Sequence, residues 1–425
     1  MLDIKFIRSN SHLVEDNLRR REDPEKIRML HQLMKNDDDR REIITRLDAL
    51  RQVRNDASVE ISNLKKSRQD ISKKLGEMSK ISDDISKFET KLDEVETRCR
   101  FDLMRIPNML HASVPIGKDD NENVEIRRWG KQNFGFEPKD HMTILEKMNL
   151  IDSKSAAGVV GHGFFYLKGK LAKLDYALQM FAVDVLIDRG FTLIEPPFML
   201  QRKPYEGVTD LSDFESVMYK IENEDLYLIA TSEHPVAAMM MDKVVLSDDL
   251  PLKFAGISPC FRREVGAHGK YTRGLFRMHQ FNKIEQFIFC LPDQSWELHE
   301  ELQRNSEEMM ELLEIPYRVV NICTGDIGSI AAKKYDIEIL MADGKYREVG
   351  SNSNCTDYQA RRLNVKYRGK EGQAPAGFVH TLNNTGIATS RVMIAVLENH
   401  QQKDGSVKIP KALQKYTGFS EISAK

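Results

Sequence analysis

The chain has 425 residues, a formal net charge of −2 and five cysteines with no C-x-x-C pair. This length suits two or three domains, and the balanced charge excludes a protein that binds nucleic acid as an overall polycation, so any such contact needs a local basic patch. The scattered cysteines argue against a disulfide scaffold and a cysteine-rich zinc knuckle. The start, MLDIKFIRSN, lacks the apolar core of a signal peptide and no run reaches membrane-spanning length, so we expect a cytoplasmic protein with no membrane partner.

Two long helices are predicted in the first hundred residues. Apolar or long side chains recur alternately every four and three residues over 43–64 and again over 78–99, which is the period of a coiled-coil seam. The segment between them, KKSRQDISKKLGEMSK, breaks the pattern, so a short turn makes the two helices antiparallel. The remaining faces are charged almost throughout, which favours a projecting hairpin over the alternative, an ordinary pair of core helices.

The tip of this hairpin, residues 65–80, carries six basic side chains against Asp70 and Glu77. Ordinary solvated helix charge mixes the signs more evenly, as residues 83–96 do. Lysine and arginine side chains far from the core can meet an RNA backbone without reading its bases. The residues that we expect to contact RNA are Lys65, Lys66, Arg68, Lys73 and Lys74.

The hairpin ends at Ile106-Pro107, because proline disfavours helix in the residue before it, and a polar connection follows. We therefore predict one domain over 1–108 and another over 109–425. Short β-like runs (226–229, 254–257, 276–289 and 318–321) alternate in the second domain with helical stretches (171–189, 296–313 and 391–400). This pattern is typical of an α+β fold on an antiparallel sheet flanked by helices.

The stretch FRREVGAHGKYTRGLFRMHQFNKIEQF contains six Lys or Arg and only two acids. A strand over 275–287 would place Arg277, Phe281 and Glu285 on one face, over about 27 Å. A second strand over 254–264 would add Arg262 from an antiparallel neighbour, with Glu264 on the same face. Such a face offers guanidinium groups for phosphates, a ring for a base and carboxylates for amino groups.

This stretch resembles motif 2 of the class II aminoacyl-tRNA synthetases, in the form found in seryl-tRNA synthetases, and the resemblance covers nearly the whole chain. RGFTLIEPPFML is similar to motif 1, and TLNNTGIATSRVMIAVLENHQ to motif 3. LYLIATSEHPVA is similar to the serine-binding T-x-E segment, REVGSNSNCTDYQARR to the E-V-x-S segment, and the hairpin to the tRNA-binding arm. Two departures are Gly350, where the family often has serine, and GVVGHGFFYLKG, which lacks an arginine of many relatives.

The resemblance implies a class II catalytic domain that activates L-serine with ATP and Mg²⁺, without zinc, and transfers it to tRNA(Ser) and also tRNA(Sec), bound across a homodimer. Residues 1–108 would be the tRNA-binding domain. The catalytic residues implied are Arg262, Arg391 and Glu264. Those implied for ATP are Arg262, Arg263, Glu264, Arg277, Met278, Phe281, Glu348, Val349, Gly350, Ser351 and Arg391. Those implied for serine are Thr231, Ser232, Glu233, Arg262, Glu285, Asn383 and Thr385. Glu348 and Ser351 would hold Mg²⁺ through ATP.

Rival interpretations remain open on the sequence alone. One is a synthetase-like enzyme that charges carrier proteins, against which the complete hairpin counts. Another is a non-catalytic RNA-binding dimer, which would be expected to lose residues such as Arg262, Glu264, Glu348 or Arg391, all of which are present. Taken alone, Thr385 fits a helix-capping role about as well as a binding role.

Overall fold

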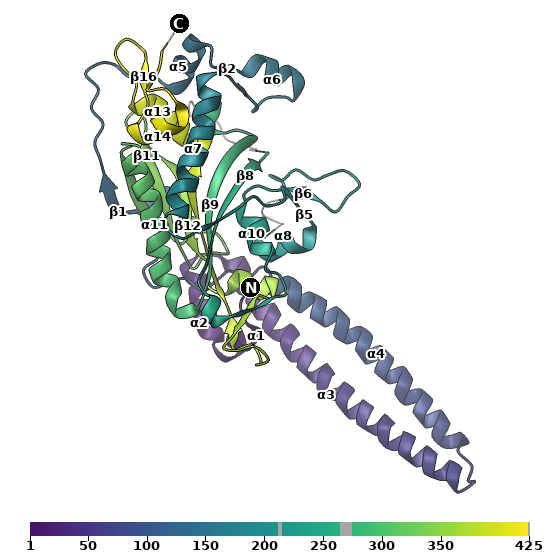
Figure 1. The fold of residues 1–425 in the computed structure, drawn as a ribbon. Helices are drawn as coiled ribbons and strands as arrows, with labels where there is room; N and C mark the ends of the chain where they lie inside the picture. The colour runs from purple at the N-terminus through teal and green to yellow at the C-terminus, as the bar shows by residue number, and fades with distance from the viewer. Residues whose placement is uncertain (211–214, 264–273, 424–425) are drawn as a thin grey trace. The chain divides into compact units, whose positions relative to one another are not determined.

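The computed structural model describes residues 1–210, 215–263 and 274–423. The chain forms two compact units, Leu2–Pro107 and Asn108–Lys425, the second together with Met1. The first unit is helical, and the second is a twisted sheet with helices against it (Figure 1). Among the described residues, no helix combines the length and the apolar character needed to cross a membrane.

The helical unit contains α1 (Ile4–Ser9), α2 (Ser11–Arg20), α3 (Pro24–Lys66) and α4 (Ser72–Leu103). Helix α3 begins at Pro24 because the Asp23 carboxylate accepts hydrogen bonds from the backbone N–H groups of Glu25 and Lys26, both at 3.1 Å. Proline also suits a first helical position. The helix is therefore longer than the repeat over 43–64 predicts, and α2 packs against it.

The predicted coiled-coil seam is confirmed along α3 and α4, which pack against each other. Leu47 and Ile61 of α3 and Ile85 and Val95 of α4 are buried, whereas the charged positions beside them are exposed. Burial of these apolar side chains stabilises the hairpin more than its exposed ion pairs do, because surface pairs contribute only about 0–1 kcal/mol each.

The turn of the hairpin, residues 67–71, is shorter than the break in the apolar pattern. Arg68 adopts a φ of 56°, and the Asp70 carboxylate accepts a hydrogen bond of 2.9 Å from the backbone N–H of Ser72. Gly76 lies inside α4, where a glycine costs roughly 1 kcal/mol relative to alanine. The basic tip is thus mostly helical.

The second unit is built on an eight-stranded sheet. In spatial order its strands are β1 (Val124–Trp129), β10 (Tyr317–Asn321), β11 (Lys333–Leu340), β12 (Tyr346–Asn354), β15 (His380–Ala388), β9 (Gln280–Cys290), β8 (Leu252–Phe261) and β4 (Thr192–Ile194). All neighbours pair antiparallel except β4, which lies parallel to β8 at the edge. The predicted α+β fold on a mostly antiparallel sheet is confirmed.

Helices cover both faces of this sheet. The predicted helices appear as α7 (Lys170–Ile187), α11 (Ser295–Leu312) and α13 (Thr389–Asn399), and the others are α5 (His141–Met148), α6 (Ser153–Val159), α8 (Arg202–Val208), α10 (Glu233–Ala238), α12 (Tyr358–Leu363) and α14 (Lys411–Thr417). Helix α11 packs on the back of the sheet, where Gln286 and Asn384 both donate to the backbone carbonyl of Leu302. The face on the other side of the central strands stays open between α10, α12 and a loop over 326–331.

Short strands complete the unit. They are β2 (Ile151–Asp152), β3 (Tyr166–Leu167), β5 (Met199–Leu200), β6 (Tyr227–Leu228), β7 (Val244–Leu246), β13 (Lys366–Arg368), β14 (Gly377–Phe378), β16 (Val407–Lys408) and β17 (Glu421–Ile422). They form small sheets of two or three strands that are separate from the main sheet.

The two strands expected around motif 2 are present but shorter than predicted. Strand β9 starts at Gln280 rather than at 275, because Gly274 takes a φ of 71° and opens a 3₁₀ turn over Gly274–Phe276. Strand β8 ends at Phe261, so Arg262 follows the strand rather than belonging to it. The pairing itself is antiparallel as predicted, with Cys260 opposite Phe281.

Candidate active site

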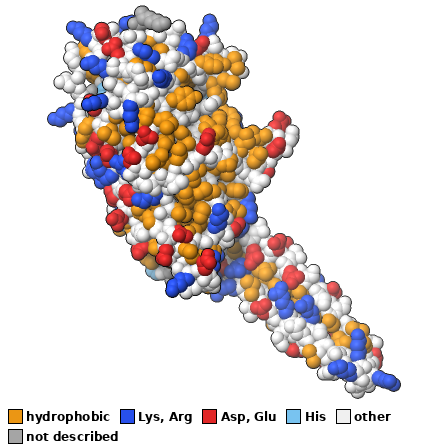
Figure 2. Space-filling view, in the orientation of Figure 1, with side chains coloured by type: hydrophobic (Ala, Val, Ile, Leu, Met, Phe, Trp, Pro, Cys, Tyr) orange, Lys and Arg blue, Asp and Glu red, His pale blue; other side chains and the backbone are white. Residues whose placement is uncertain are grey.

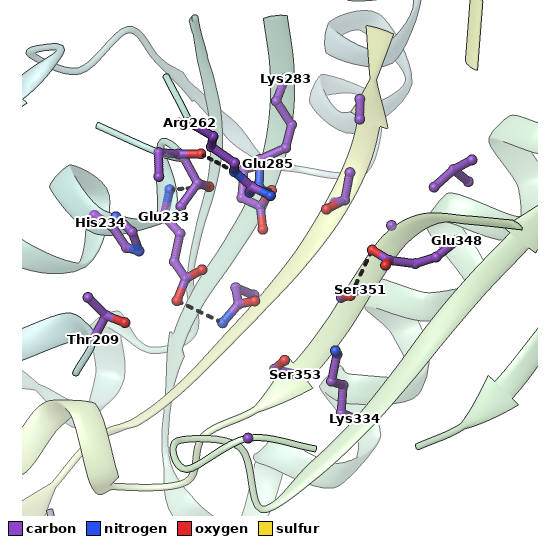
Figure 3. Close-up of a pocket in the computed structure, with 18 of the residues that line it drawn as sticks. Thr209, Glu233, His234, Arg262, Lys283, Glu285, Lys334, Glu348, Ser351 and Ser353 are labelled. Atoms are coloured by element: carbon purple, nitrogen blue, oxygen red, sulfur yellow. Dashed lines mark hydrogen bonds and ion pairs between the residues drawn. The ribbon is translucent and has the colours of Figure 1, made fainter. Parts of the chain in front are cut away.

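One cavity of about 610 Å³ opens on the face of the sheet that β8, β9, β15 and β12 present. Side chains of one face line it because alternate residues of a strand share a face. Figure 3 shows the acidic and basic residues that point into it from these strands and from α10. Of the residues predicted from the sequence, the cavity is lined by Thr231, Glu233, Arg262, Arg277, Met278, Phe281, Glu285, Glu348, Val349, Gly350, Ser351, Asn383, Thr385 and Arg391.

At one end of the cavity the buried carboxylate of Glu285 lies beside a lysine, and the half-buried carboxylate of Glu233 points into the same region. The Nζ of Lys283 lies 2.6 Å from Oε2 of Glu285, and both side chains are nearly inaccessible. Glu233 is the first residue of α10, and burial, together with the charge of Glu285, raises its pKa to about 7. Burial also raises the pKa of Glu285, although Lys283 offsets part of that effect. The two acids therefore need positive charge brought by a ligand or by the protein to stay ionised.

Arg262 and Phe281 form the middle of the cavity. The Nε of Arg262 donates to the backbone carbonyl of Ala230 at 3.3 Å, which holds the guanidinium over the sheet. Its Cζ lies 5.4 Å from the centroid of the Phe281 ring, which leaves the guanidinium edge directed to the cavity. A planar cation beside an aromatic ring suits a phosphate attached to a planar base.

The other end of the cavity combines a carboxylate, a hydroxyl and an arginine. Nη1 of Arg391 donates to the backbone carbonyl of Glu348 at 2.9 Å and lies 3.3 Å from its Oε1, while the hydroxyl of Ser351 lies 3.5 Å from the same oxygen. The Glu348 side chain is 46% exposed. Burial alone would raise the pKa of Glu348, but Arg391, Lys334 and Arg262 outweigh burial and lower it.

This carboxylate–hydroxyl pair fits a hard divalent cation that takes its remaining ligands from phosphates and water. In the described part of the chain, no group of three or more His, Cys, Asp or Glu converges as a metal site. Glu348 and Ser351 alone would therefore hold a cation weakly without a phosphate ligand.

Two residues predicted for the site do not line the cavity, and a third is outside the described part of the chain. Ser232 is fully buried and donates to the backbone carbonyl of Gly256 at 3.1 Å, so its hydroxyl supports the wall instead. Arg263 has an exposed side chain, and its backbone N–H donates to Val217 at 2.8 Å. Glu264 lies outside the described residues.

The positions of Thr231 and Thr385 bear on the serine-binding roles that the sequence predicts for them. The hydroxyl of Thr231 accepts a hydrogen bond of 3.2 Å from the backbone N–H of Glu233, which fixes the start of α10. Thr385 lies in β15 opposite Glu285, whereas α13 begins at Thr389, so the helix-capping interpretation of Thr385 is wrong. Gly350 faces Thr385 closely, since a Cβ on it would lie 3.0 Å from that of Thr385.

Other polar residues of the cavity were not predicted from the sequence. Lys283 lies between Phe281 and Glu285 with the same strand parity, so the period of two was the signal that could have found it. Lys334 of β11 and Ser353 of β12 also line the cavity; Lys334 lies outside the quoted motifs, and Ser353 lies in the segment similar to the E-V-x-S motif but was not assigned a role. They reach the cavity only because β11 and β12 pair side by side.

Comparisons with known proteins agree over the whole chain. Residues 1–110 match the model of the seryl-tRNA synthetase N-terminal domain, and residues 216–400 match that of the tRNA synthetase class II core domain (G, H, P, S and T). The serine–tRNA ligase of Methanospirillum hungatei JF-1 is 52% identical over 424 residues, which cover 99% of this chain and 100% of that protein.

Two solved structures are similar to the fold at full length. The seryl-tRNA synthetase of Pyrococcus horikoshii, complexed with ATP, matches with a TM-score of 0.95 and 47% identity, covering 100% of both chains. The cytoplasmic serine–tRNA ligase of Naegleria fowleri, in complex with AMP, matches with a TM-score of 0.88 and 35% identity, covering 100% of this chain and 99% of that one. The resemblance predicted from the motifs is confirmed, and the chain belongs to the seryl-tRNA synthetase family.

Proposed function

We propose that the chain is a serine–tRNA ligase, which activates L-serine with ATP and transfers the seryl group to the 3′ end of tRNA(Ser). The observation that carries the proposal is one cavity with Glu233 and Glu285 at one end, the Glu348–Arg391 pair at the other, and Arg262 in its lining. The first end suits an amino acid, and the second suits a nucleotide triphosphate. Relatives that are 52% identical over their full length carry this name.

In the first step, an oxygen of the serine carboxylate forms a bond with the α-phosphorus of ATP while the bond to the pyrophosphate oxygen breaks. Both reactants are anionic, so the main tasks of the protein are alignment and positive charge. Arg262 lines the cavity and its charge acts on both Glu233 and Glu348, so it would contact the α-phosphate and the carboxylate together. No general base is needed, because the serine carboxylate is already ionised at pH 7.

ATP would occupy the end of the cavity that Phe281 and Arg391 define. Phe281 would stack on the adenine, while Arg277 and Arg391 would meet the terminal phosphates, and Glu264 would accept from the adenine amino group. Met278, Val349 and Gly350 would complete the surface around the nucleotide, with Arg263 beside it. Glu348 and Ser351 would hold Mg²⁺, which supplies charge to the phosphates when it is bound.

Serine would lie between Glu233 and Glu285, with its ammonium group between the two carboxylates. Thr385, Thr231 and Asn383 offer hydroxyl and amide groups around the side chain. A site that hydrogen-bonds the substrate hydroxyl rejects an analogue without it by roughly 10⁴-fold, because buried partners are otherwise unpaired. Alanine, which lacks that hydroxyl, would be rejected on this ground.

The two units would have different roles: residues 1–108 would bind tRNA, and residues 109–425 would catalyse both steps of the reaction. The basic tip, with Lys65, Lys66, Arg68 and Lys73 exposed, supports contact with a tRNA backbone. Lys74 is half-buried and pairs with Glu60 at 2.9 Å and Glu77 at 3.3 Å, so it would contribute less. Because the hairpin would recognise the shape of the tRNA, it would also bind tRNA(Sec). We expect the aminoacylation reaction to take place in the cytoplasm.

We place the active form as a homodimer that binds tRNA across its two subunits. Exposed apolar side chains support this on α7 and on the neighbouring edge strand β4. Tyr176 is 69% exposed, Ile187 47% and Leu193 43%, and Met180 lies on the same helix. Figure 2 shows apolar side chains gathered on one face of the sheet-containing unit, as a subunit interface needs.

A charging assay tests the proposal. Radiolabelled serine, ATP and Mg²⁺ are incubated with the purified chain and a transcript of tRNA(Ser), tRNA(Sec) or a control tRNA. Serine should become acid-precipitable with the first two transcripts and not with the control. Adenylate formation without any charging of tRNA would favour an enzyme that serves a carrier protein, and would contradict the proposal.

A further inference from the structure

Within residues 1–210, 215–263 and 274–423, the hydrogen bonds that hold the Glu233 side chain reach one of its two carboxylate oxygens. Its Oε1 accepts a hydrogen bond of 3.0 Å from Nε2 of Gln359 and one of 3.2 Å from Nδ2 of Asn383. Among the described residues, neither amide reaches Oε2, and the side chain points from α10 into the cavity (Figure 3). The carboxylate is thus anchored by one oxygen and offers the other to a ligand.

The amide of Gln359 is fully engaged, and its orientation is fixed. Besides donating to Glu233, Nε2 donates to the backbone carbonyl of Val208 at 3.1 Å, and Oε1 accepts from the hydroxyl of Thr381 at 2.7 Å. Both neighbours of the nitrogen, a carboxylate and a carbonyl, can only accept, so a flipped amide would lose both of these hydrogen bonds. A glutamate here would face Glu233 with a like charge.

Gln359 is fully buried and does not line the cavity, so it cannot touch a substrate. It belongs to α12, whereas its partners lie on α10, at the end of α8 and on β15. It therefore fixes the start of α10, and with it the Glu233 side chain, against the sheet strand that carries Asn383 and Thr385. An effect of Gln359 on a substrate passes through the cavity residues that it holds, which are Glu233 and, at its backbone carbonyl, Val208.

We propose that Gln359 is a positioning residue for amino-acid recognition: it holds Oε1 of Glu233 so that Oε2 receives the ammonium group of serine. This inference rests on the proposed function, because it takes the Glu233 end of the cavity as the serine site. Asn383 makes the second hydrogen bond to Oε1, which gives it the same positioning role in addition to its place in the cavity wall.

A pH-dependent readout follows from the surroundings of Glu233. The charged and titratable groups that face it are Glu285, Lys283, Arg262, His234, Cys355 and Tyr205. Burial and Glu285 raise the pKa of Glu233, whereas Lys283, the Gln359 hydrogen bond and Arg262 lower it. Binding of an ammonium group needs the carboxylate ionised, so kcat/KM for serine falls as pH drops through this pKa. Loss of the Gln359 hydrogen bond should move that fall to higher pH.

The test is serine-dependent pyrophosphate exchange by Gln359→Met, with Gln303→Met as the matched control. Gln303 of α11 is equally buried, accepts from Asn352 at 3.3 Å and lies away from the cavity. In Gln359→Met the KM for serine should rise at least about tenfold, which is the scale of one hydrogen bond to a charged group, while the KM for ATP stays unchanged. The acidic limb of the pH profile should move upward. The control should change none of these values.

Two results would overturn the inference. One is a folded Gln359→Met enzyme with an unchanged serine KM and pH profile. The other is an equal rise of both KM values, which would mark Gln359 as a merely structural tie. If Gln359→Met does not fold, Thr381→Val replaces it as the test, because this variant removes only the hydroxyl that donates to Oε1 of Gln359. The KM of Thr381→Val for serine should also rise. An unchanged value would refute the positioning role. If the wild-type chain catalysed pyrophosphate exchange with another amino acid but not with serine, the proposed function itself would be refuted.

Discussion

At the scale of single residues, the arginines of the cavity are expected to dominate catalysis. Arg262 is held by the carbonyl of Ala230 and Arg391 by Glu348, so each would present a prearranged charge to the reacting phosphates. We predict that Arg262→Ala and Arg391→Ala each lower the rate of pyrophosphate exchange by roughly 100-fold or more, because one well-placed donor contributes about 3 kcal/mol to a charged transition state.

The control for these variants is Arg128→Ala. Arg128 lies on β1, the edge strand at the other end of the sheet from β4. Its side chain lies 2.7 Å from Glu125 and is 55% exposed. Its removal should leave exchange unchanged. Near-normal exchange by either cavity variant, with thermal unfolding like that of the wild type, would show that the assignment of motifs 2 and 3 is wrong.

Glu285 should matter for serine and for stability together. We predict that Glu285→Ala raises the KM for serine far more than the KM for ATP, since Glu285 lies at the carboxylate end of the cavity. It also leaves the buried Lys283 without its partner, and breaking a buried pair costs about 3–5 kcal/mol. The double variant Lys283→Met/Glu285→Ala should regain thermal stability but not serine affinity. Loss of ATP affinity with normal serine affinity would contradict this placement.

The residues that sequence reasoning found, and those that it missed, differ in how they reach the site. Phe281, Glu285 and Thr385 stand in motifs, and the period of a strand places them on one face. Gln359 lies within the quoted segment REVGSNSNCTDYQARR, but that segment does not reveal that its partners are Val208 and Thr381. A role that depends on contacts between distant segments appears only when the fold brings those segments together.

At the scale of elements, the helical hairpin was predictable because its repeat is local. The spacing of Leu47, Ile61, Ile85 and Val95 alone marks two helices and the faces that they bury. The bounds were harder to predict: the start of α3 depends on the Asp23 cap, and the start of β9 on the left-handed conformation of Gly274. Single capping or turn residues set these bounds, and the spacing of apolar residues does not predict where such residues act.

The hairpin tip should bind tRNA through charge. We predict that Lys65→Ala/Lys66→Ala raises the KM for tRNA without changing pyrophosphate exchange. It should also lower the log–log salt slope of binding by about 2, one for each phosphate that a lysine no longer neutralises. Lys74→Ala is the matched control, because Glu60 and Glu77 already neutralise Lys74. An equal effect of Lys74→Ala, or an unchanged salt slope in the double variant, would rule out a tip that works by exposed charge.

At the scale of the whole molecule, the two units should separate the two steps. We predict that replacing residues 43–99 by a short linker leaves serine-dependent exchange largely intact and cuts tRNA charging by orders of magnitude. The part of α3 that packs against α2 remains, so the rest of the helical unit keeps its core. Equal loss of both activities would show that the hairpin supports the catalytic fold, and unchanged charging would remove its tRNA role.

The central claim is that the cavity activates serine, and amino-acid-dependent pyrophosphate exchange tests it most directly. The purified full-length chain is assayed with ATP, Mg²⁺, labelled pyrophosphate and each of the twenty amino acids in turn. Serine should support rapid exchange, and alanine, which lacks only the hydroxyl, should support roughly 10⁴-fold less in kcat/KM. Exchange with threonine or glycine but not with serine would contradict the account.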